Sequence, residues 1–246
     1  GTQVDGHDYI STAITEGALS VVCEEFPEEI DESVTYIKVD DSAQALGVIA
    51  ANFYENPSDK LKLIGVTGTN GKTTSVTLMY DLFRMLGYKV GLISTVVNKI
   101  HAEKVDSTHT TPNSLDLNEL LSRMVQKGCL YCFMEVSSHA VDQKRIAGVN
   151  FAGGVFTNIT HDHLDYHKTF DNYIASKKAF FDVLTERSFV LTNADQLHGE
   201  TMVHDTRAKV HTYGINSVAD FKAKIIDSRF DGLQLDIGGK ELYTKL

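Results

Sequence analysis

The run Gly65-Val66-Thr67-Gly68-Thr69-Asn70-Gly71-Lys72-Thr73-Thr74 lies between two segments of different periodicity. Residues 61–66 are largely apolar, as in a buried strand, and residues 73–86 follow a helical pattern. Strand, glycine-rich turn and helix are the setting in which Gly-Lys-Thr binds phosphate, because backbone N–H groups and the helix N-terminus face the anion. The strict phosphate-loop pattern has glycine where Val66 stands, so a chance Gly-Lys-Thr is the alternative interpretation. The flanking strand and helix favour a phosphate loop.

The residues of this loop have separate expected tasks. Lys72 would reach the β- and γ-phosphates, and the Thr73 hydroxyl would help to hold Mg²⁺. The backbone of the loop would surround the remaining phosphate oxygens. The predicted nucleotide-binding residues are therefore Gly68, Thr69, Asn70, Gly71, Lys72, Thr73 and Thr74.

Length, composition and charge limit the class of protein. A chain of 246 residues with 42% hydrophobic content can form one large domain or two ordinary domains with a sizeable core. The formal net charge of −10 argues against nucleic-acid or anionic-membrane partners. No apolar run approaches the roughly 20 residues that span a bilayer. We find no signal peptide, and we interpret the opening Gly1, without Met, as a processed or cut chain.

The cysteines indicate a reducing compartment. Cys23, Cys129 and Cys132 are too few for a disulfide framework, so a cytoplasmic location fits best. Cys129 and Cys132 have the spacing of a redox motif. They stand at the entry to an apolar strand rather than at a helix start, so we predict buried cysteines.

Residues 1–57 are predicted to form a small, partial α/β domain. We expect helices at 9–17 and 42–54 and strands at 18–23 and 35–39, with an acidic loop between the strands. Leu46, Ile49, Ala50 and Phe53 share one face of the second helix. Residues 56–60, which contain Pro57, form the predicted linker to the next domain.

Residues 58–246 are predicted to form an α/β domain with a mostly parallel sheet flanked by helices, because strands and helices alternate. The expected strands are 61–66, 89–95, 131–136, 153–157 and 188–192, and the expected helices are 73–86, 114–127 and 170–185. A hairpin-like region ends at Val105. From Lys209 onward, strands at 209–213, 221–227, 232–237 and 241–246 predict a small antiparallel appendage. Ligands of such sheets collect at the carboxyl ends of the strands, which places the loops after Val66, Val136 and Thr157 at one site.

Two of these loops carry side chains that suit a phosphate or metal site. Glu135 ends a strand beside the phosphate loop and could hold Mg²⁺, although taken alone it would be read as a solvent-facing glutamate. Gln143 and Arg145 could hold an anionic substrate, with surface charge as the alternative. Residues 158–167 contain three histidines and two aspartates after another strand. Zinc, magnesium or a loop without metal are all compatible with them, and the phosphate loop favours magnesium.

Lys177 lies inside the helix predicted for residues 170–185, among Tyr173, Phe180 and Phe181. A lysine on the apolar side of such a helix normally snorkels to solvent. A desolvated lysine has a lowered pKa, however, and could react with CO₂ to become a carbamate. The residues alone favour snorkelling.

Taken together, four segments of the chain resemble the Mur ligases. They are Gly68-Thr69-Asn70-Gly71-Lys72-Thr73-Thr74, Met134-Glu135-Val136-Ser137-Ser138-His139, Gln143 with Arg145, and Phe156-Thr157-Asn158 with Asp162-His163-Leu164-Asp165-Tyr166-His167. Within the family, the Glu-Val-Ser-Ser-His segment followed by Gln and Arg is similar to the MurE group. The resemblance runs along the whole chain and implies a uridine-nucleotide-binding domain at 1–57 and a central ATP-binding domain at 58–246.

The resemblance also implies roles for single residues. Lys72, His163 and Lys177 match catalytic positions, with Lys177 as a carbamate. The implied Mg²⁺ positions are Thr73, Glu135, His163 and Lys177. The implied positions for a muramoyl-dipeptide substrate are Gln3, Thr110, Thr111, Ser137, Gln143 and Arg145.

The reaction implied by the resemblance is ATP-dependent amide formation in peptidoglycan synthesis, and so in cell-wall biogenesis, cell shape and cell division. A diamino acid, meso-diaminopimelate or L-lysine, would join the D-Glu of UDP-MurNAc-L-Ala-D-Glu through an acyl phosphate, in a monomeric enzyme. The start of the first domain, an adenine-contacting segment and the third domain of the family are absent from this sequence, so we expect the chain alone to be inactive. The alternatives are a sister ligase such as folylpolyglutamate synthetase, a P-loop NTPase that is not a ligase, or a zinc-binding domain.

Overall fold

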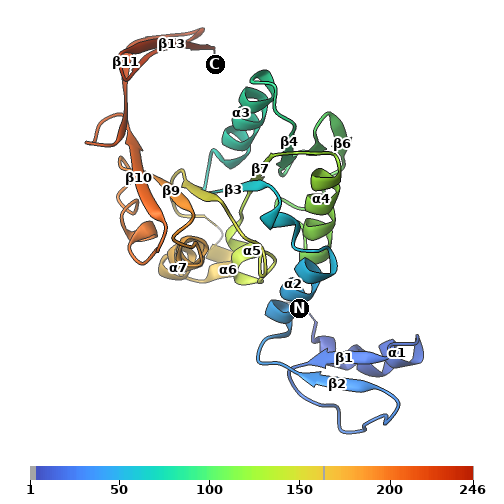
Figure 1. The fold of residues 1–246 in the computed structure, drawn as a ribbon. Coiled ribbons are helices and arrows are strands. Elements are labelled where there is room, and N and C mark those ends of the chain that lie inside the picture. Colours follow the sequence, from blue (N-terminus) through green and yellow to red (C-terminus); the bar gives the residue numbers. More distant parts are fainter. Residues whose placement is uncertain (1–3, 163, 246) are drawn as a thin grey trace.

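A mixed sheet forms the centre of the molecule (Figure 1). The structure, a computed structural model, describes residues 4–162 and 164–245. Within these residues the strand order of the large sheet is β13-β12-β11-β10-β9-β8-β3-β7-β4-β5-β6. Strands β10, β9, β8, β3, β7 and β4 run parallel, and pairing from β4 to β6 is antiparallel. The strands are β3 (Lys62–Thr67), β4 (Val90–Ile93), β5 (Asn98–Ile100), β6 (Glu103–Val105), β7 (Tyr131–Glu135), β8 (Gly153–Phe156), β9 (Phe189–Asn193), β10 (Lys209–Gly214), β11 (Phe221–Arg229), β12 (Gly232–Ile237) and β13 (Lys240–Lys245).

Helices cover both faces of the parallel strands, as their near-continuous apolar sequences require. Neighbouring residues of a strand point to opposite faces, so Leu63 and Ile64 of β3 enter different cores. One core contains Val76 and Tyr80 of α3, and the other contains Leu117 of α4. The helices are α3 (Lys72–Met85), α4 (Ser114–Gln126), α5 (Ser138–Asp142), α6 (Leu164–His167) and α7 (Phe170–Asp182), with a short 3-10 helix η3 (Thr201–Val203). The predicted α/β fold class with a mostly parallel sheet is confirmed.

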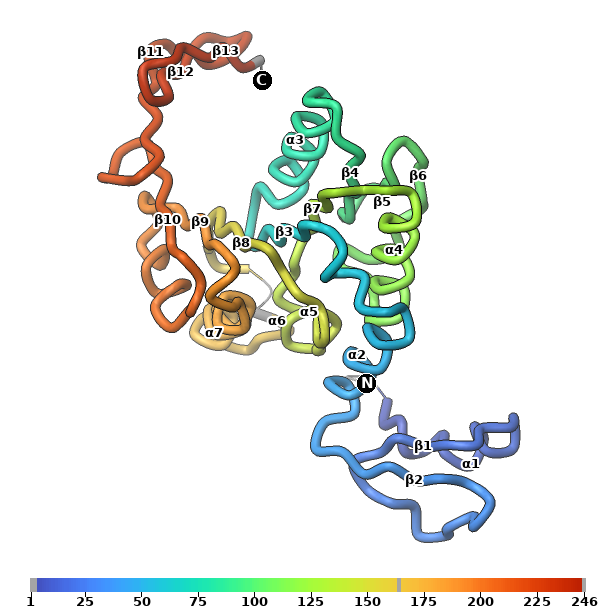
Figure 2. Tube along the Cα trace, in the orientation of Figure 1, coloured from blue at the N-terminus to red at the C-terminus, as the bar shows by residue number. Residues whose placement is uncertain are grey.

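The first residues form a separate two-stranded parallel sheet of β1 (Ser20–Cys23) and β2 (Thr35–Lys38). The helical turn η1 (Gly6–Tyr9) and α1 (Ile10–Thr15) accompany it, and a small apolar cluster of Ile10, Val21, Cys23 and Val34 forms its core. Helix α2 (Ser42–Phe53) and the 3-10 helix η2 (Pro57–Asp59) then lead into β3. Figure 2 shows this unit at one end of the molecule and the last strands at the other.

Strand β10 corrects one prediction. Residues 209–213 were expected in an antiparallel appendage, but β10 pairs parallel with β9 along five residues, from Lys209 with Phe189 to Tyr213 with Asn193. The antiparallel arrangement begins only with β11, which pairs with β12, and β12 pairs with β13. The short connection through η3 carries too weak a helical pattern to reveal the crossover that a parallel pair needs.

All three cysteines are free and buried, and the burial of Cys129 and Cys132 confirms the prediction made for them. Among the described residues no helix combines the length and apolar character needed to cross a membrane.

Candidate active site

The phosphate loop joins β3 to α3, and the side chain of its lysine bonds back to the backbone of the loop. Gly71, with φ of 85°, precedes the first residue of α3, Lys72. The Lys72 ammonium donates hydrogen bonds to the carbonyl oxygens of Gly68 and Thr69, both at 2.8 Å. A Cβ on Gly68 would lie 1.9 Å from Thr157 Oγ1, so only glycine allows this approach. The loop therefore has the conformation that its glycines predict.

The loop after β8 holds the phosphate loop in place. Asn158 accepts a hydrogen bond from Asn70 N through its side-chain oxygen and donates to Asn70 O through its amide nitrogen, at 2.9 and 3.0 Å. Thr157 Oγ1 also donates to Asn70 O, at 2.8 Å. These contacts join the carboxyl ends of β3 and β8, as the topology of the sheet predicts. Asn158 was not predicted to be a site residue, although its place at a strand end was a usable signal.

Lys177 of α7 points into this loop rather than to solvent. Its side chain is 1% exposed, and Nζ donates to Gly68 O at 3.0 Å, the same oxygen that accepts from Lys72. Burial, and then the charge of Lys72, lower the pKa of Lys177 to about 7. The snorkelling interpretation is therefore wrong, because α7 packs this face against the sheet and leaves no path to water.

Glu135 is buried at the end of β7, which excludes the solvent-facing alternative. Its carboxylate accepts hydrogen bonds from Thr95 N at 2.8 Å and from Thr95 Oγ1 at 3.2 Å. Its carbonyl accepts from Thr111 Oγ1 at 2.8 Å, and Thr110 Oγ1 lies 3.1 Å from the same Thr95 hydroxyl oxygen. Burial lowers the pKa of Lys72, and the negative charge of Glu135 opposes that shift. The Glu135 carboxylate is therefore close enough to act electrostatically on the Lys72 ammonium.

Gln143 and Arg145 meet the loop that contains Thr111. Arg145 Nη1 donates to Thr111 O at 3.0 Å, and Arg145 Nε and Nη2 both donate to Gln143 Oε1. Ser137 N donates to Thr111 Oγ1 at 3.1 Å. The structure thus brings the predicted substrate residues 111, 137, 143 and 145 into one hydrogen-bonded group. Tyr166, which contacts Gln143, was not predicted, because nothing in its sequence position indicates that partner.

The two described histidines of the segment rich in histidine, His161 and His167, have different partners. His161 stacks on Phe170 with ring centroids 4.3 Å apart, and His167 Nε2 lies 2.9 Å from Ser138 Oγ. Asp162 is close enough for its charge to act on Lys72 and Lys177. Across residues 4–162 and 164–245, no three His, Cys, Asp or Glu side chains form a metal-binding group. The predicted residues His163 and Gln3 lie outside the described residues.

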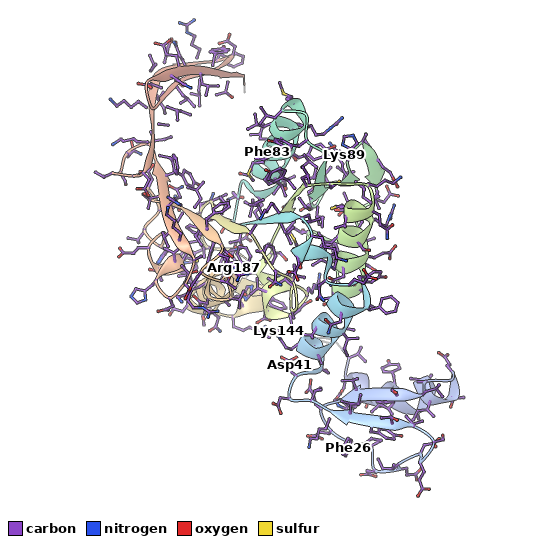
Figure 3. All side chains as sticks on the ribbon, in the orientation of Figure 1. Phe26, Asp41, Phe83, Lys89, Lys144 and Arg187 are labelled. Carbon is purple, nitrogen blue, oxygen red and sulfur yellow. The ribbon has the colours of Figure 1, made fainter. Side chains whose placement is uncertain are left out.

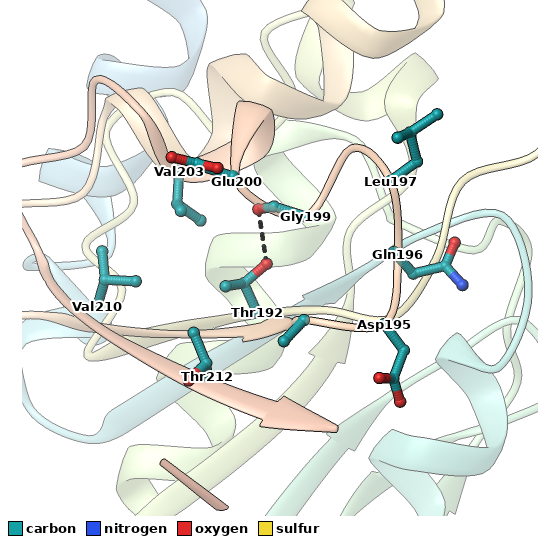
Figure 4. Close-up of a pocket in the computed structure, with 10 residues that line it drawn as sticks. Thr192, Asp195, Gln196, Leu197, Gly199, Glu200, Val203, Val210 and Thr212 are labelled. Atoms are coloured by element: carbon teal, nitrogen blue, oxygen red, sulfur yellow. Dashed lines mark hydrogen bonds between the residues drawn. The ribbon is translucent and has the colours of Figure 1, made fainter. Parts of the chain in front are cut away.

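A separate cavity of about 580 Å³ lies between β9, β10 and η3 (Figure 4). Its lining includes Thr192, Asp195 and Thr212 but none of the predicted site residues. The Asp195 carboxylate accepts backbone N–H bonds from Ile215, Asn216 and Ser217, and these bonds, led by that from Ile215, lower its pKa to about 2. Asp195 thereby ties the turn after β9 to the loop after β10, which is a structural task. Because none of the predicted site residues lines this cavity, the candidate active site remains the one at the phosphate loop.

A phosphate loop at the carboxyl edge of a parallel sheet, with buried Glu135 and Lys177 beside it, defines a P-loop nucleotide-binding α/β protein. Residues 66–244 match the Mur ligase middle domain, and residues 1–54 match the catalytic domain of the Mur ligase family. The chain belongs to the Mur ligase family.

Relatives refine this placement. The chain is 58% identical, over 247 aligned residues, to a UDP-N-acetylmuramoyl-L-alanyl-D-glutamate–2,6-diaminopimelate ligase of Cytophaga hutchinsonii, with 100% of this chain and 51% of that protein covered. A solved structure of a ligase with the same description has a TM-score of 0.80 at 24% identity, covering 97% of this chain and 49% of the other. MurF of Thermotoga maritima in complex with ADP has a TM-score of 0.53 at 17% identity, covering 100% and 53%. The chain spans about half the length of the curated relatives it matches.

Proposed function

We propose that the complete protein is an ATP-dependent ligase that adds a diamino acid to the D-Glu carboxylate of UDP-MurNAc-L-Ala-D-Glu, in the cytoplasm. One observation carries the proposal. Buried Glu135 and the Thr111–Arg145 group are joined by hydrogen bonds at the end of β7, and β7 pairs with β3, the strand that leads into the phosphate loop. A phosphoryl donor and a carboxylate acceptor can be held together at such an edge, and the relatives described above carry this activity in their names.

The nucleotide half of the site would consist of the phosphate loop. Lys72 already donates to two carbonyls of its own loop, so it would exchange these weaker partners for the β- and γ-phosphates of ATP. The implied Mg²⁺ ion fits the donor chemistry, because buried Glu135 and the Thr73 hydroxyl offer the oxygen ligands that this ion prefers. His163 and Lys177 complete the proposed set. When bound, Mg²⁺ would neutralise phosphate charge.

Lys177 is proposed to act as a carbamate. With a pKa of about 7, a substantial fraction of its amine is neutral at neutral pH and carries a lone pair. That lone pair can attack the carbon of CO₂, and the nitrogen then releases a proton to water, which leaves an anionic N-carboxylate. Lys72 lies close enough to lower the pKa of Lys177, so the new anion would also gain an attractive partner.

The remaining residues would hold the acceptor carboxylate. Arg145 can present N–H groups to it. Thr110, Thr111 and Ser137 belong to the hydrogen-bonded network around Glu135 and Arg145. A carboxylate oxygen would attack the γ-phosphorus of ATP and release ADP. The amine of the incoming amino acid would then attack the acyl carbon, lose a proton and displace phosphate. Lys72 and Arg145 would offset the repulsion between the two anions during the first step.

The test is phosphate release by the full-length polypeptide that carries these residues. We expect release only when ATP, UDP-MurNAc-L-Ala-D-Glu and meso-diaminopimelate or L-lysine are all present, with Lys72→Ala reducing kcat at least about 100-fold. Release that requires neither the muramoyl dipeptide nor an amino acid would instead identify a simple NTPase. Release that requires a folate and glutamate would identify the sister ligase.

A further inference from the structure

A chain of hydrogen bonds continues from Arg145 away from the phosphate loop. Gln143 Nε2 donates to Tyr166 OH at 3.2 Å, and Tyr166 OH donates to Asp142 Oδ2 at 2.6 Å. Asp142 is the last residue of α5, and Tyr166 belongs to α6. The chain therefore connects the loop after β8 to the proposed substrate residues that follow β7.

Asp142, at the end farthest from Arg145, determines which group donates and which accepts in each of these hydrogen bonds. An ionised carboxylate only accepts, so the Tyr166 hydroxyl must donate to Asp142. The hydroxyl can then only accept from Gln143, which turns the amide nitrogen toward Tyr166 and the amide oxygen toward Arg145. Partial burial, followed by the bond to Asp142, raises the pKa of Tyr166, so the hydroxyl keeps its proton at neutral pH.

This arrangement determines which N–H groups of Arg145 remain for a ligand. Nε and Nη2 each use one N–H on Gln143 Oε1, and Nη1 uses one on Thr111 O. A guanidinium has five N–H groups, so one remains on each of the two terminal nitrogens. Such a pair matches the two oxygens of a carboxylate.

The backbone of Lys144, which lies between Gln143 and Arg145, favours the contact between their side chains. Lys144, labelled in Figure 3, has φ of 56°, a left-handed conformation that is uncommon for residues other than glycine. It lets the side chains of Gln143 and Arg145, which are two residues apart, meet at one oxygen. Unusual backbone of this kind concentrates at functional sites.

We propose that Tyr166, oriented by Asp142, is a positioning residue that fixes Gln143 and thereby aims the two remaining N–H groups of Arg145 at a carboxylate of the acceptor substrate. The inference rests on the proposed function and names a residue to which nothing above gave a role. The hydroxyl is not alone in holding α6 in place, because the Tyr166 ring packs against His139 of α5, with centroids 4.1 Å apart, and His167 Nε2 lies 2.9 Å from Ser138 Oγ. Tyr166→Phe therefore removes the hydrogen-bond relay from Gln143 through Tyr166 to Asp142 and keeps this packing.

The experiment compares steady-state constants of Tyr166→Phe and wild type in the full-length polypeptide. We expect KM for the muramoyl dipeptide to rise about tenfold, with KM for ATP and the melting temperature unchanged. In a Gln143→Ala background, the same substitution should change KM less than twofold, because Tyr166 acts only through that amide. Asp142→Asn, which keeps an acceptor, should resemble wild type, whereas Asp142→Ala should resemble Tyr166→Phe. Tyr80→Phe is the matched control, since the Tyr80 hydroxyl also donates a hydrogen bond, to the backbone carbonyl of His101, outside the site.

Two results would overturn the inference. One is an unchanged KM for the dipeptide in Tyr166→Phe while the wild type turns over. The other is a tenfold effect that persists without Gln143. If the wild type shows no dipeptide-dependent turnover, the proposed function fails, and the relay is then judged from a crystal structure of Tyr166→Phe. Arg145 should have left Gln143 Oε1 in that structure, and an unmoved pair would refute the relay itself.

Discussion

At the scale of single residues, two lysine ammonium groups converge on one carbonyl oxygen. Lys72 and Lys177 both donate to Gly68 O, at 2.8 and 3.0 Å, in a buried setting. Two positive charges so close repel each other, and burial disfavours each of them. The more deeply buried Lys177 is the group whose pKa falls to about 7, so it yields its proton first. The loop thereby keeps one charged lysine beside an amine that is partly neutral at neutral pH.

Lys177→Met should stabilise the protein at acidic pH. The pKa of Lys177 is lower in the folded state than its ordinary value of 10.5, so the unfolded chain binds more protons between pH 7 and pH 10. Stability should therefore rise with pH across that window in the wild type and rise less in the variant. At pH 6 we expect a gain on the order of 1–3 kcal/mol, after the loss of the bond to Gly68. Urea unfolding at several pH values measures it.

Lys178→Met is the control for that prediction. Burial alone would lower the pKa of Lys178, but hydrogen bonds to Asp182 and Asp205 outweigh it and raise the pKa. Its substitution should leave the slope of stability between pH 7 and pH 10 unchanged and lower stability slightly. Parallel pH profiles for wild type and Lys177→Met would show that Lys177 is not neutralised in the folded state.

At the scale of elements, α2 shows that hydrophobic periodicity alone does not predict which residues of a helix are buried. The sequence groups Leu46, Ile49, Ala50 and Phe53 on one face, yet Leu46, Ile49 and Phe53 are 45%, 47% and 76% exposed, and of the four only Ala50 is buried. The buried residues of the helix are Gly47, Ala50 and Ala51. A Cβ on Gly47 would lie 2.6 Å from both Ala147 Cβ and Ala147 O. Close approach of two backbones selects small residues, which a hydrophobic pattern does not detect.

Gly47→Ala should destabilise the protein, although replacing glycine by alanine usually stabilises a helix. In an exposed helix this change gains about 0.5–1 kcal/mol. Here the added methyl group meets the backbone of Ala147, and overpacking costs about 1–3 kcal/mol, so we expect a net loss near 1–2 kcal/mol in urea unfolding. Ile49→Ala on the exposed face should cost less than about 1 kcal/mol. A more stable Gly47→Ala variant would mean that α2 does not pack closely at this point.

The sequence predicted the elements more completely than the site. Apolar runs and glycine stops located the central strands and helices, because burial on two faces leaves a strong local signal. Strand β10 was misplaced since its partner, β9, is chosen by tertiary packing. Without the resemblance, the residues alone favour a snorkelling Lys177, because nothing in the local sequence shows that Gly68 O accepts a hydrogen bond from it. Tyr166 was missed for the same reason, as its partners come from another loop.

At the scale of the whole molecule, burial is concentrated in the middle. The parallel strands lie between two large cores, whereas β1 and β2 share a cluster of only four buried residues. A two-stranded sheet has little stability of its own. At the other end (Figure 2), the strands β11 to β13 leave Ile225 and Leu242 about half exposed, with no helix of the described residues against them. Stability should therefore fall from the centre toward both ends.

Amide hydrogen exchange can measure that gradient. We expect peptides from residues 62–67 and 131–135 to exchange only through global unfolding, because their hydrogen bonds lie inside the sheet. Peptides from 20–38 and 221–245 should exchange at least about 100-fold faster under the same conditions, through local opening. Peptides of α4, which packs on the central sheet, provide the internal reference. Equal protection of β1, β2 and β3 would show that the first residues unfold together with the central sheet and that their small core is not the weak point of the molecule.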